Sequence, residues 1–113
     1  MLLDTPAPPY VAVIFTSIRS DADQAGYDAM AAEMERLAAT QPGYLGIESA
    51  RRADGLGISV SYFRTAADAR HWKANADHLG AQRLGRERWY RAYTVRIAEV
   101  QRQYEFGKSP RGT

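Results

Sequence analysis

The pattern of apolar residues predicts four β-strands. Residues 10–18 are β-branched and aromatic, and both of their alternating sets are apolar, which is typical of a strand buried on both faces. Residues 44–52 and 56–63 also have strand character, and the Asp-Gly turn signal between them predicts a hairpin. Residues 92–104 alternate again, so we expect a long final strand there.

Two stretches with helical spacing lie between these strands. Residues 20–24 supply capping side chains for the first helix, and residues 41–43 end it. Apolar side chains recur between them at the spacing of an amphipathic helix: Tyr27, Met30, Met34, Leu37 and Ala38. Residues 65 to about 90 have helical composition, and Gly80 and Gly85 are two places where this second helix can be interrupted.

The element order βαββαβ predicts an α+β protein with the ferredoxin-like fold. In that fold two helices cover one face of a four-stranded antiparallel sheet. The first and last strands are apolar on both alternating sets, so the uncovered face would expose a large apolar surface in a monomer. Because soluble proteins rarely tolerate such a surface, we expect a homodimer that presses two sheets together through this face.

Size and composition fit one ordinary globular domain. The chain has 113 residues, of which 45% are hydrophobic and 25% charged, so disordered and low-complexity architectures are not expected. We predict an N-terminal arm at residues 1–9, which lacks the features of a signal peptide, a domain at 10–106 and a flexible tail at 107–113. The longest apolar run, residues 11–15, is far below the roughly 18 residues of a membrane helix, so no membrane partner is expected.

Cysteine content and charge narrow the classes of partner. The chain has no cysteine, which excludes disulfides, thiolate nucleophiles and cysteine-ligated metals and makes a reducing cytoplasm the expected location. The net charge of +2 combines an acidic first half with a basic second half. Because the arginines are spaced through helix and strand patterns, and no nucleic-acid signature accompanies them, we expect no nucleic-acid partner. The same arginines suit a pocket for a small anionic or phenolic ligand.

The second helical stretch carries candidate chemistry on one side. At about 100° per residue, one sector of a continuous helix holds aromatic and hydrogen-bonding side chains, with Trp72 beside it. These side chains are His71, Asn75, His78, Gln82, Arg86 and Trp89. Aromatic rings interleaved with hydrogen-bonding groups are typical of a small-molecule pocket rather than of an aliphatic core. A break at either glycine would shift the phase of this stripe.

Three segments carry a recognisable combination of motifs. They are the run Gln-Pro-Gly-Tyr-Leu-Gly-Ile-Glu at residues 41–48, the strand Ile-Ser-Val-Ser-Tyr-Phe at 58–63, and residues 69–78 with their central tryptophan. Together they resemble the antibiotic biosynthesis monooxygenase family over roughly residues 10–106. The resemblance implies a dimeric α/β barrel, which contains the same fold that the element order predicts.

What the resemblance implies about activity differs between branches of that family. Some members oxidise polyphenolic anthrones to quinones without metal or flavin, and others degrade haem or oxidise a quinol. Cofactor-independent members carry a tryptophan on the second helix and a hydrogen-bonding side chain six residues later, and Trp72 and His78 match these two places. The second place is commonly tyrosine, so His78 departs from the pattern and its proton-transfer role stays open.

The haem-degrading branch fits this chain less well. Its members are expected to carry an asparagine on the first strand and a helix histidine some ten residues after the tryptophan. Here the first strand ends Thr16-Ser17-Ile18, and Gln82 lies ten residues after Trp72. Haem is therefore disfavoured, and we expect no cofactor.

Each candidate side chain has a functional and a structural interpretation. His78 can act as a general base or anion stabiliser, since imidazole titrates near neutrality, or it can be a structural histidine. Trp72 can form a flat wall for a polycyclic ligand or belong to the core. Arg86 can stabilise an enolate or phenolate oxygen or pair with acids of the first helix. Asn75 and Gln82 can bind substrate or lie at the surface.

Tyr62 and His71 complete the set of candidates. Tyr62 ends an alternating strand, so we expect its ring in the core, with a hydroxyl able to reach the pocket. His71 is expected at the surface. His71 and His78 lie two helical turns apart, roughly 10 Å along the axis, which is too far for the two rings to share one ion. We therefore expect no metal site.

These observations lead to one functional hypothesis and two alternatives. The first is a cofactor-independent monooxygenase that oxidises a small phenolic or quinol-type aromatic with O₂. Its catalytic candidates are His78 and Arg86, and its substrate-binding candidates are Trp72, Asn75, Tyr62 and Gln82. The alternative is a non-catalytic dimeric small-molecule-binding or stress-response protein of the same fold. A proton-transfer isomerase is the third, and it would consume no oxygen.

Overall fold

The computed structural model describes residues 2–78 and 80–107, and within them only the backbone of residues 77, 78, 81 and 82. Four strands form one antiparallel sheet in the order β2-β3-β1-β4. The strands are β1 (Tyr10–Arg19), β2 (Tyr44–Arg51), β3 (Leu56–Phe63) and β4 (Tyr90–Val100). The helical elements are α1 (Gln24–Ala38), α2 (Ala66–His78), α3 (Ala81–Leu84) and η1, a π-helical turn at Gly85–Trp89.

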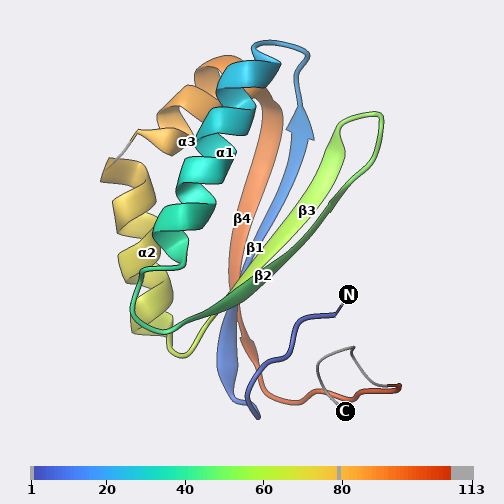
Figure 1. The fold of residues 1–113 in the computed structure, drawn as a ribbon, viewed down its shortest axis with the longest axis vertical. Helices are drawn as coiled ribbons and strands as arrows, with labels where there is room; N and C mark the ends of the chain where they lie inside the picture. Colours follow the sequence, from blue (N-terminus) through green and yellow to red (C-terminus); the bar gives the residue numbers. More distant parts are fainter. Residues whose placement is uncertain (1, 79, 108–113) are drawn as a thin grey trace.

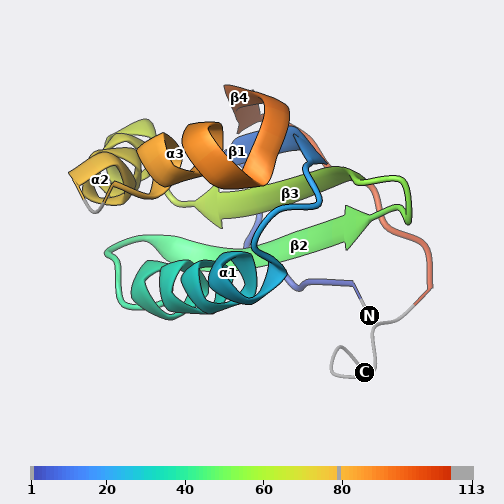
Figure 2. The same cartoon turned by 90° about the horizontal axis from the view of Figure 1, so that it is seen from above.

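The helices cover one side of the sheet and leave the other side uncovered (Figure 1). Seen from above, α1 lies beside the β2 edge, whereas α2 and α3 lie toward β3 and β1 (Figure 2). This arrangement confirms the predicted ferredoxin-like α+β fold. The four strands of one chain form an open sheet, so a closed barrel would require a second copy.

The second helical stretch is divided rather than continuous. Gly80, shortly after the end of α2, has a φ of +75°, a left-handed backbone conformation that favours glycine. The chain therefore does not continue as one helix past this residue. Gly85 then packs so closely on the Tyr90 ring that a Cβ there would lie 3.0 Å from Cδ2 of that ring. After this turn β4 begins at Tyr90, two residues earlier than predicted, and it ends at Val100, four residues earlier.

Strand register separates the sheet into a pocket face, which lies under the helices, and an outer face. Successive side chains of one strand point to opposite sides of the sheet, and two residues paired across neighbouring strands point to the same side. The pocket face of the two central strands carries Val11, Val13, Phe15 and Ser17 with Gly57, Ser59, Ser61 and Phe63. Their outer face carries Ala12, Ile14, Thr16 and Ile18 with Leu56, Ile58, Val60 and Tyr62.

The buried core is small and lies at one end of the pocket face. Val11, Phe63 and Ala69 form its buried centre, and Phe63 is fully buried. Three partly buried residues pack against that centre: Val13, Tyr44 and Trp72. This cluster lies at the α2 end, and a cavity remains between the helices and the rest of the sheet. In the described part of the chain, no helix has the length and apolarity needed to cross a bilayer.

Candidate functional site

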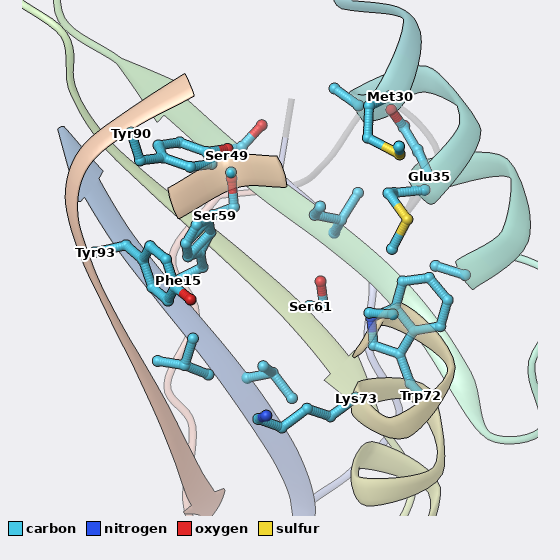
Figure 3. Close-up of a pocket in the computed structure, with 18 of the residues that line it drawn as sticks. Phe15, Met30, Glu35, Ser49, Ser59, Ser61, Trp72, Lys73, Tyr90 and Tyr93 are labelled. Carbon is cyan, nitrogen blue, oxygen red and sulfur yellow. The ribbon is translucent and has the colours of Figure 1, made fainter. Parts of the chain in front are cut away.

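A cavity of about 330 Å³ lies between the pocket face and the helices (Figure 3). All four strands contribute to its floor, and α1, α2 and η1 contribute to its walls. This volume is at the lower end of the range for pockets that hold small organic ligands. The cavity therefore has room for one small aromatic molecule.

The larger part of the cavity wall is apolar. Val13, Phe15 and Val95 rise from the floor, while Met30 and Met34 come from α1. At one side, the rings of Tyr90 and Tyr93 meet Phe15 edge to face, at centroid distances of 5.2 Å and 5.3 Å. Methionine side chains adapt their shape, and aromatic rings offer flat contact area, so this wall suits a planar apolar ligand.

Three serine side chains interrupt the apolar floor on the β2 and β3 side. Ser49, Ser59 and Ser61 all line the cavity, and Figure 3 shows their hydroxyl oxygens. Among the described residues, none of these three hydroxyls has a hydrogen-bond partner in the protein. Serine is smaller than the valine or isoleucine that a strand normally places over its core. The small serine side chains therefore leave room for the cavity, and their hydroxyls place polar atoms on its floor.

One end of the cavity is closed by contacts between β1, α1 and η1. The guanidinium of Arg19 donates to the Trp89 carbonyl at 2.6 Å and stacks on the Tyr27 ring, 3.9 Å from its centroid. Trp89 Nε1 donates to Asp23 Oδ2 at 3.2 Å, and Asp23 caps α1 by accepting from the Gly26 N–H. These contacts hold the first turn of α1 and the π-helical turn together.

The hydroxyl of Tyr90 at this end stays protonated at neutral pH. Burial raises the pKa of Tyr90, and a hydrogen bond with the Tyr27 hydroxyl raises it further. Nearby Arg51 and Arg19 act in the opposite direction but do not reverse the shift. Tyr90 therefore acts here as a neutral hydrogen-bonding group.

Two charged residues also line the cavity, Glu35 from α1 and Lys73 from α2. Burial, and secondarily the Glu35 carboxylate, raises the pKa of Tyr44 beside them. In the part of the chain that the structure describes, no group of three histidine, aspartate or glutamate residues could hold a metal ion.

Trp89 of the predicted stripe lines the cavity, and so does the candidate site residue Trp72. Its ring is half-buried and also packs against the core, so the structure combines the two interpretations of this residue. Figure 3 shows the indole nitrogen on the side where Ser61 lies. Lys73 and Ala76 line the cavity beside it, whereas His71 is exposed. The side of α2 that faces the cavity is thus displaced by about one residue from the side that the sequence predicted.

The other described candidates are engaged elsewhere. Asn75 Nδ2 donates to Gln41 Oε1 at 2.8 Å, which ties α2 to the loop before β2. Tyr62 lies on the outer face, where its hydroxyl donates to Glu48 Oε1 at 2.9 Å. Burial, followed by that hydrogen bond, raises the pKa of Tyr62 to about 12. These two residues do not line the cavity.

Arg86 does not line the cavity itself but contacts Tyr93, which does. It is exposed, and its Nη1 donates to the Tyr93 hydroxyl at 3.1 Å, while the Tyr93 ring lines the cavity. No acid of α1 pairs with Arg86 among the described contacts. The side chains of His78 and Gln82 lie outside the described residues.

Sequence reasoning missed the serines and the methionine wall. A signal for the serines was present, because Ser59 and Ser61 belong to the same alternating set as Phe63, which has to face the core. Met30 and Met34 were expected only as core packing on the first helix. The depth of the cavity depends on how far α1 stands from the sheet, which an apolar pattern does not specify.

Comparisons with known proteins agree with this fold. The antibiotic biosynthesis monooxygenase family model matches residues 9–84. The uncharacterized protein YqjZ of Bacillus subtilis (strain 168) is 50% identical over 105 residues, which cover 93% of this chain and 91% of that protein.

Solved structures with the same fold share little sequence with this chain. SnoaB, a cofactor-independent oxygenase from Streptomyces nogalater, aligns with a TM-score of 0.67 and 14% identity, over 89% of this chain and 100% of that one. Rv0793 from Mycobacterium tuberculosis aligns with a TM-score of 0.71 and 14% identity, over 85% of this chain and 99% of that one. At this identity the likeness establishes the fold alone. The family match extends over most of the chain, and the protein belongs to the antibiotic biosynthesis monooxygenase family.

Proposed function

We propose that this protein is a cofactor-independent monooxygenase that oxidises a small phenolic or quinol-type aromatic with O₂. The observation that carries the proposal is the apolar cavity of about 330 Å³ lined by Trp72, Phe15 and Tyr90. Family membership supports it, and so does the fold shared with a cofactor-independent oxygenase.

The proposed reaction oxidises a ring carbon of the phenolic substrate, which is an acidic CH₂ group in the keto tautomer of that substrate, to a carbonyl. A base removes one proton, and the resulting anion transfers one electron to O₂. The substrate radical and superoxide then combine and take up a proton to give a hydroperoxide, which loses water as the carbonyl forms. One oxygen atom of O₂ thus enters the product and the other leaves as water. The protein contributes orientation, exclusion of water and stabilisation of the anion.

For Trp72, Arg86 and Asn75, the roles in this proposal follow from where each side chain lies, whereas the roles of His78 and Gln82 rest on the sequence alone. Trp72 provides a flat wall against which the aromatic ring is oriented. Arg86 acts as a positioning residue, because it donates to the Tyr93 hydroxyl rather than contacting the cavity itself. Asn75 holds α2, and with it Trp72, against the loop at Gln41. His78 or a bound water molecule is proposed as the base, and Gln82 as a further substrate contact.

Oxygen uptake tests this proposal. Metal-stripped protein is mixed with a panel of anthrones, quinols and phenols in an oxygen electrode, and quinone absorbance is followed in parallel. We expect uptake above the autoxidation blank for at least one compound, and loss of that excess in Trp72→Ala protein whose fold is verified by circular dichroism. Uptake equal to the blank across the panel would reject the oxygenase.

A second candidate function is a dimeric small-molecule-binding protein without oxygenase chemistry. It is favoured by the observation that Asn75 and Tyr62 are engaged away from the cavity, so the predicted residues do not converge on one catalytic centre. This candidate predicts that aromatic ligands bind to the protein and that no oxygen is consumed. Calorimetry beside the oxygen electrode distinguishes the two functions.

We also propose that the protein forms a homodimer through the outer face of the sheet. Ile18 and Ile58 on this face are exposed, as are Tyr104 and Phe106 in the segment after β4, and Phe106 is fully exposed. Apolar area of this kind marks interaction surfaces in soluble proteins. Analytical ultracentrifugation should give twice the monomer mass, and Ile58→Asp should shift the protein toward monomer. The expected cytoplasmic location is part of the proposal, and cell fractionation tests it.

A further inference from the structure

The floor of the cavity is divided into a hydroxyl half and an apolar half. Ser49 pairs with Ser59 across β2 and β3, and Ser59 in turn opposes Phe15 of β1. In the neighbouring row, Ser61 lies between Ile47 of β2 and Val13 of β1. The serine hydroxyls therefore gather over β2 and β3. The part over β1 and β4 is lined by apolar side chains and by the rings of Tyr90 and Tyr93, whose hydroxyls already bond to Tyr27 and Arg86.

The three serine hydroxyls have no hydrogen-bond partner among the described residues. Ser59 and Ser61 are half-buried, and Ser49 is exposed on the edge strand. A fully apolar ligand would remove water from these hydroxyls without replacing it. Leaving a buried polar group unpaired costs about 1–3 kcal/mol, so the floor selects against such a ligand.

Strand geometry fixes the spacing of the three hydroxyls. Ser59 and Ser61 stand two residues apart on one strand, about 6.8 Å, and directly opposed residues such as Ser49 and Ser59 have Cβ atoms about 5 Å apart. The oxygen substituents of an aromatic ring system are separated by comparable distances. Trp72 lies beyond Ser61 with its indole nitrogen on that side (Figure 3), which adds a fourth polar group to the same half.

We infer that the cavity selects planar aromatics that carry at least two oxygen substituents along one edge, with that edge facing Ser49, Ser59 and Ser61. The opposite, unsubstituted edge then contacts Phe15 and Val95. This inference rests on the proposed function and deepens it, because it names the polar groups that determine substrate class and orientation. An aromatic with oxygens on both edges would place one of them against the apolar half.

Anaerobic titration calorimetry tests the inference, since no oxidation can occur without O₂. The probes are naphthalene, naphthol and naphthoresorcinol, which share one skeleton and carry no, one and two hydroxyls. We expect affinity to rise in that order. Each Ser→Ala change at positions 59 and 61 should weaken naphthoresorcinol about 5-fold, the value of one net hydrogen bond, and leave naphthalene within about twofold.

Ser17→Ala is the matched control. Ser17 lies on the same sheet face but outside the cavity, and its hydroxyl accepts from Arg51 Nη2 at 2.9 Å. It should leave the affinity for all three probes unchanged. Equal affinity for the three probes, or the same weakening for naphthalene as for naphthoresorcinol, would overturn the inference while the proposed function stands. If none of the probes binds, the cavity is not an aromatic site, and both proposals are rejected.

Discussion

Filling the cavity floor should stabilise the protein and abolish its function. Ser59 is half-buried at the centre of the floor, between Ser49 and Phe15, and its hydroxyl makes no bond to a described residue. Ser59→Val replaces that hydroxyl with two methyl groups. Each fully buried methylene-sized group contributes about 0.8 kcal/mol, so two half-buried groups contribute about 1 kcal/mol, and valine is also the better strand former.

A gain of about 1 kcal/mol corresponds to a rise of roughly 4 °C in Tm for a domain of this size. The assay pairs thermal unfolding followed by circular dichroism with oxygen uptake on a substrate found in the panel. We expect Tm to rise while turnover falls at least tenfold, because the side chain takes space that the substrate needs. Stabilisation with loss of function is the pattern expected when a site is kept open at the expense of packing.

Ser59→Thr separates the effect of volume from that of the hydroxyl. Threonine has nearly the shape of valine but keeps the hydroxyl, so it should lower turnover by crowding while retaining more affinity for hydroxylated ligands than valine does. The reasoning would be refuted if Ser59→Val lowered Tm by several degrees, because Ser59 would then be a packing residue. Unchanged turnover in the valine variant would also refute it, since the substrate would then bind elsewhere.

Three further predictions concern residues at and around the site. Trp72→Phe should keep the fold but raise the KM for aromatic substrates several-fold, because a smaller ring offers less wall, and steady-state kinetics checks this. Asn75→Ala should lower the free energy of unfolding by about 1 kcal/mol through loss of the Gln41 hydrogen bond, as urea unfolding would report. The pKa of Tyr62 in the folded protein is raised to about 12, above the ordinary value near 10. Between these two pH values the unfolded chain has lost the Tyr62 proton while the folded protein keeps it, so the free energy of unfolding falls as the pH rises. Tyr62→Phe should flatten that fall in urea unfolding curves collected across the interval, and an unchanged slope would contradict the assignment.

The fold was predictable because its strands are marked by strong local patterns. Residues 10–18 and 56–63 lie in strands with bounds within one residue of those observed, since β-branched residues and an Asp-Gly turn specify them locally. For the second helical stretch, the sequence left a continuous and an interrupted helix open, and the structure divides it into α2, α3 and η1. Helical composition between residues 65 and 90 did not decide whether Gly80 and Gly85 would interrupt it.

The candidate site was predictable only in part. Trp72 was found through the family resemblance, and it lines the cavity. The stripe around His71 was displaced, because a rotation of one residue on a helix turns a side chain by about 100°. Tyr62 was assigned to the core, and only the strand register places it on the outer face beside Glu48. Contacts between elements distant in sequence, such as Arg19 with Trp89, cannot be derived from local patterns.

Isotope labelling of O₂ tests the central claim most directly. A compound that supports oxygen uptake is converted by metal-stripped protein under O₂ carrying the heavy oxygen isotope, and the carbonyl product is analysed by mass spectrometry with autoxidation subtracted. The account predicts one labelled oxygen atom per enzymatic product molecule, with the label lost in Ser59→Val protein together with turnover. Oxygen derived from water, or a labelled yield no greater than that of the protein-free blank, would contradict it.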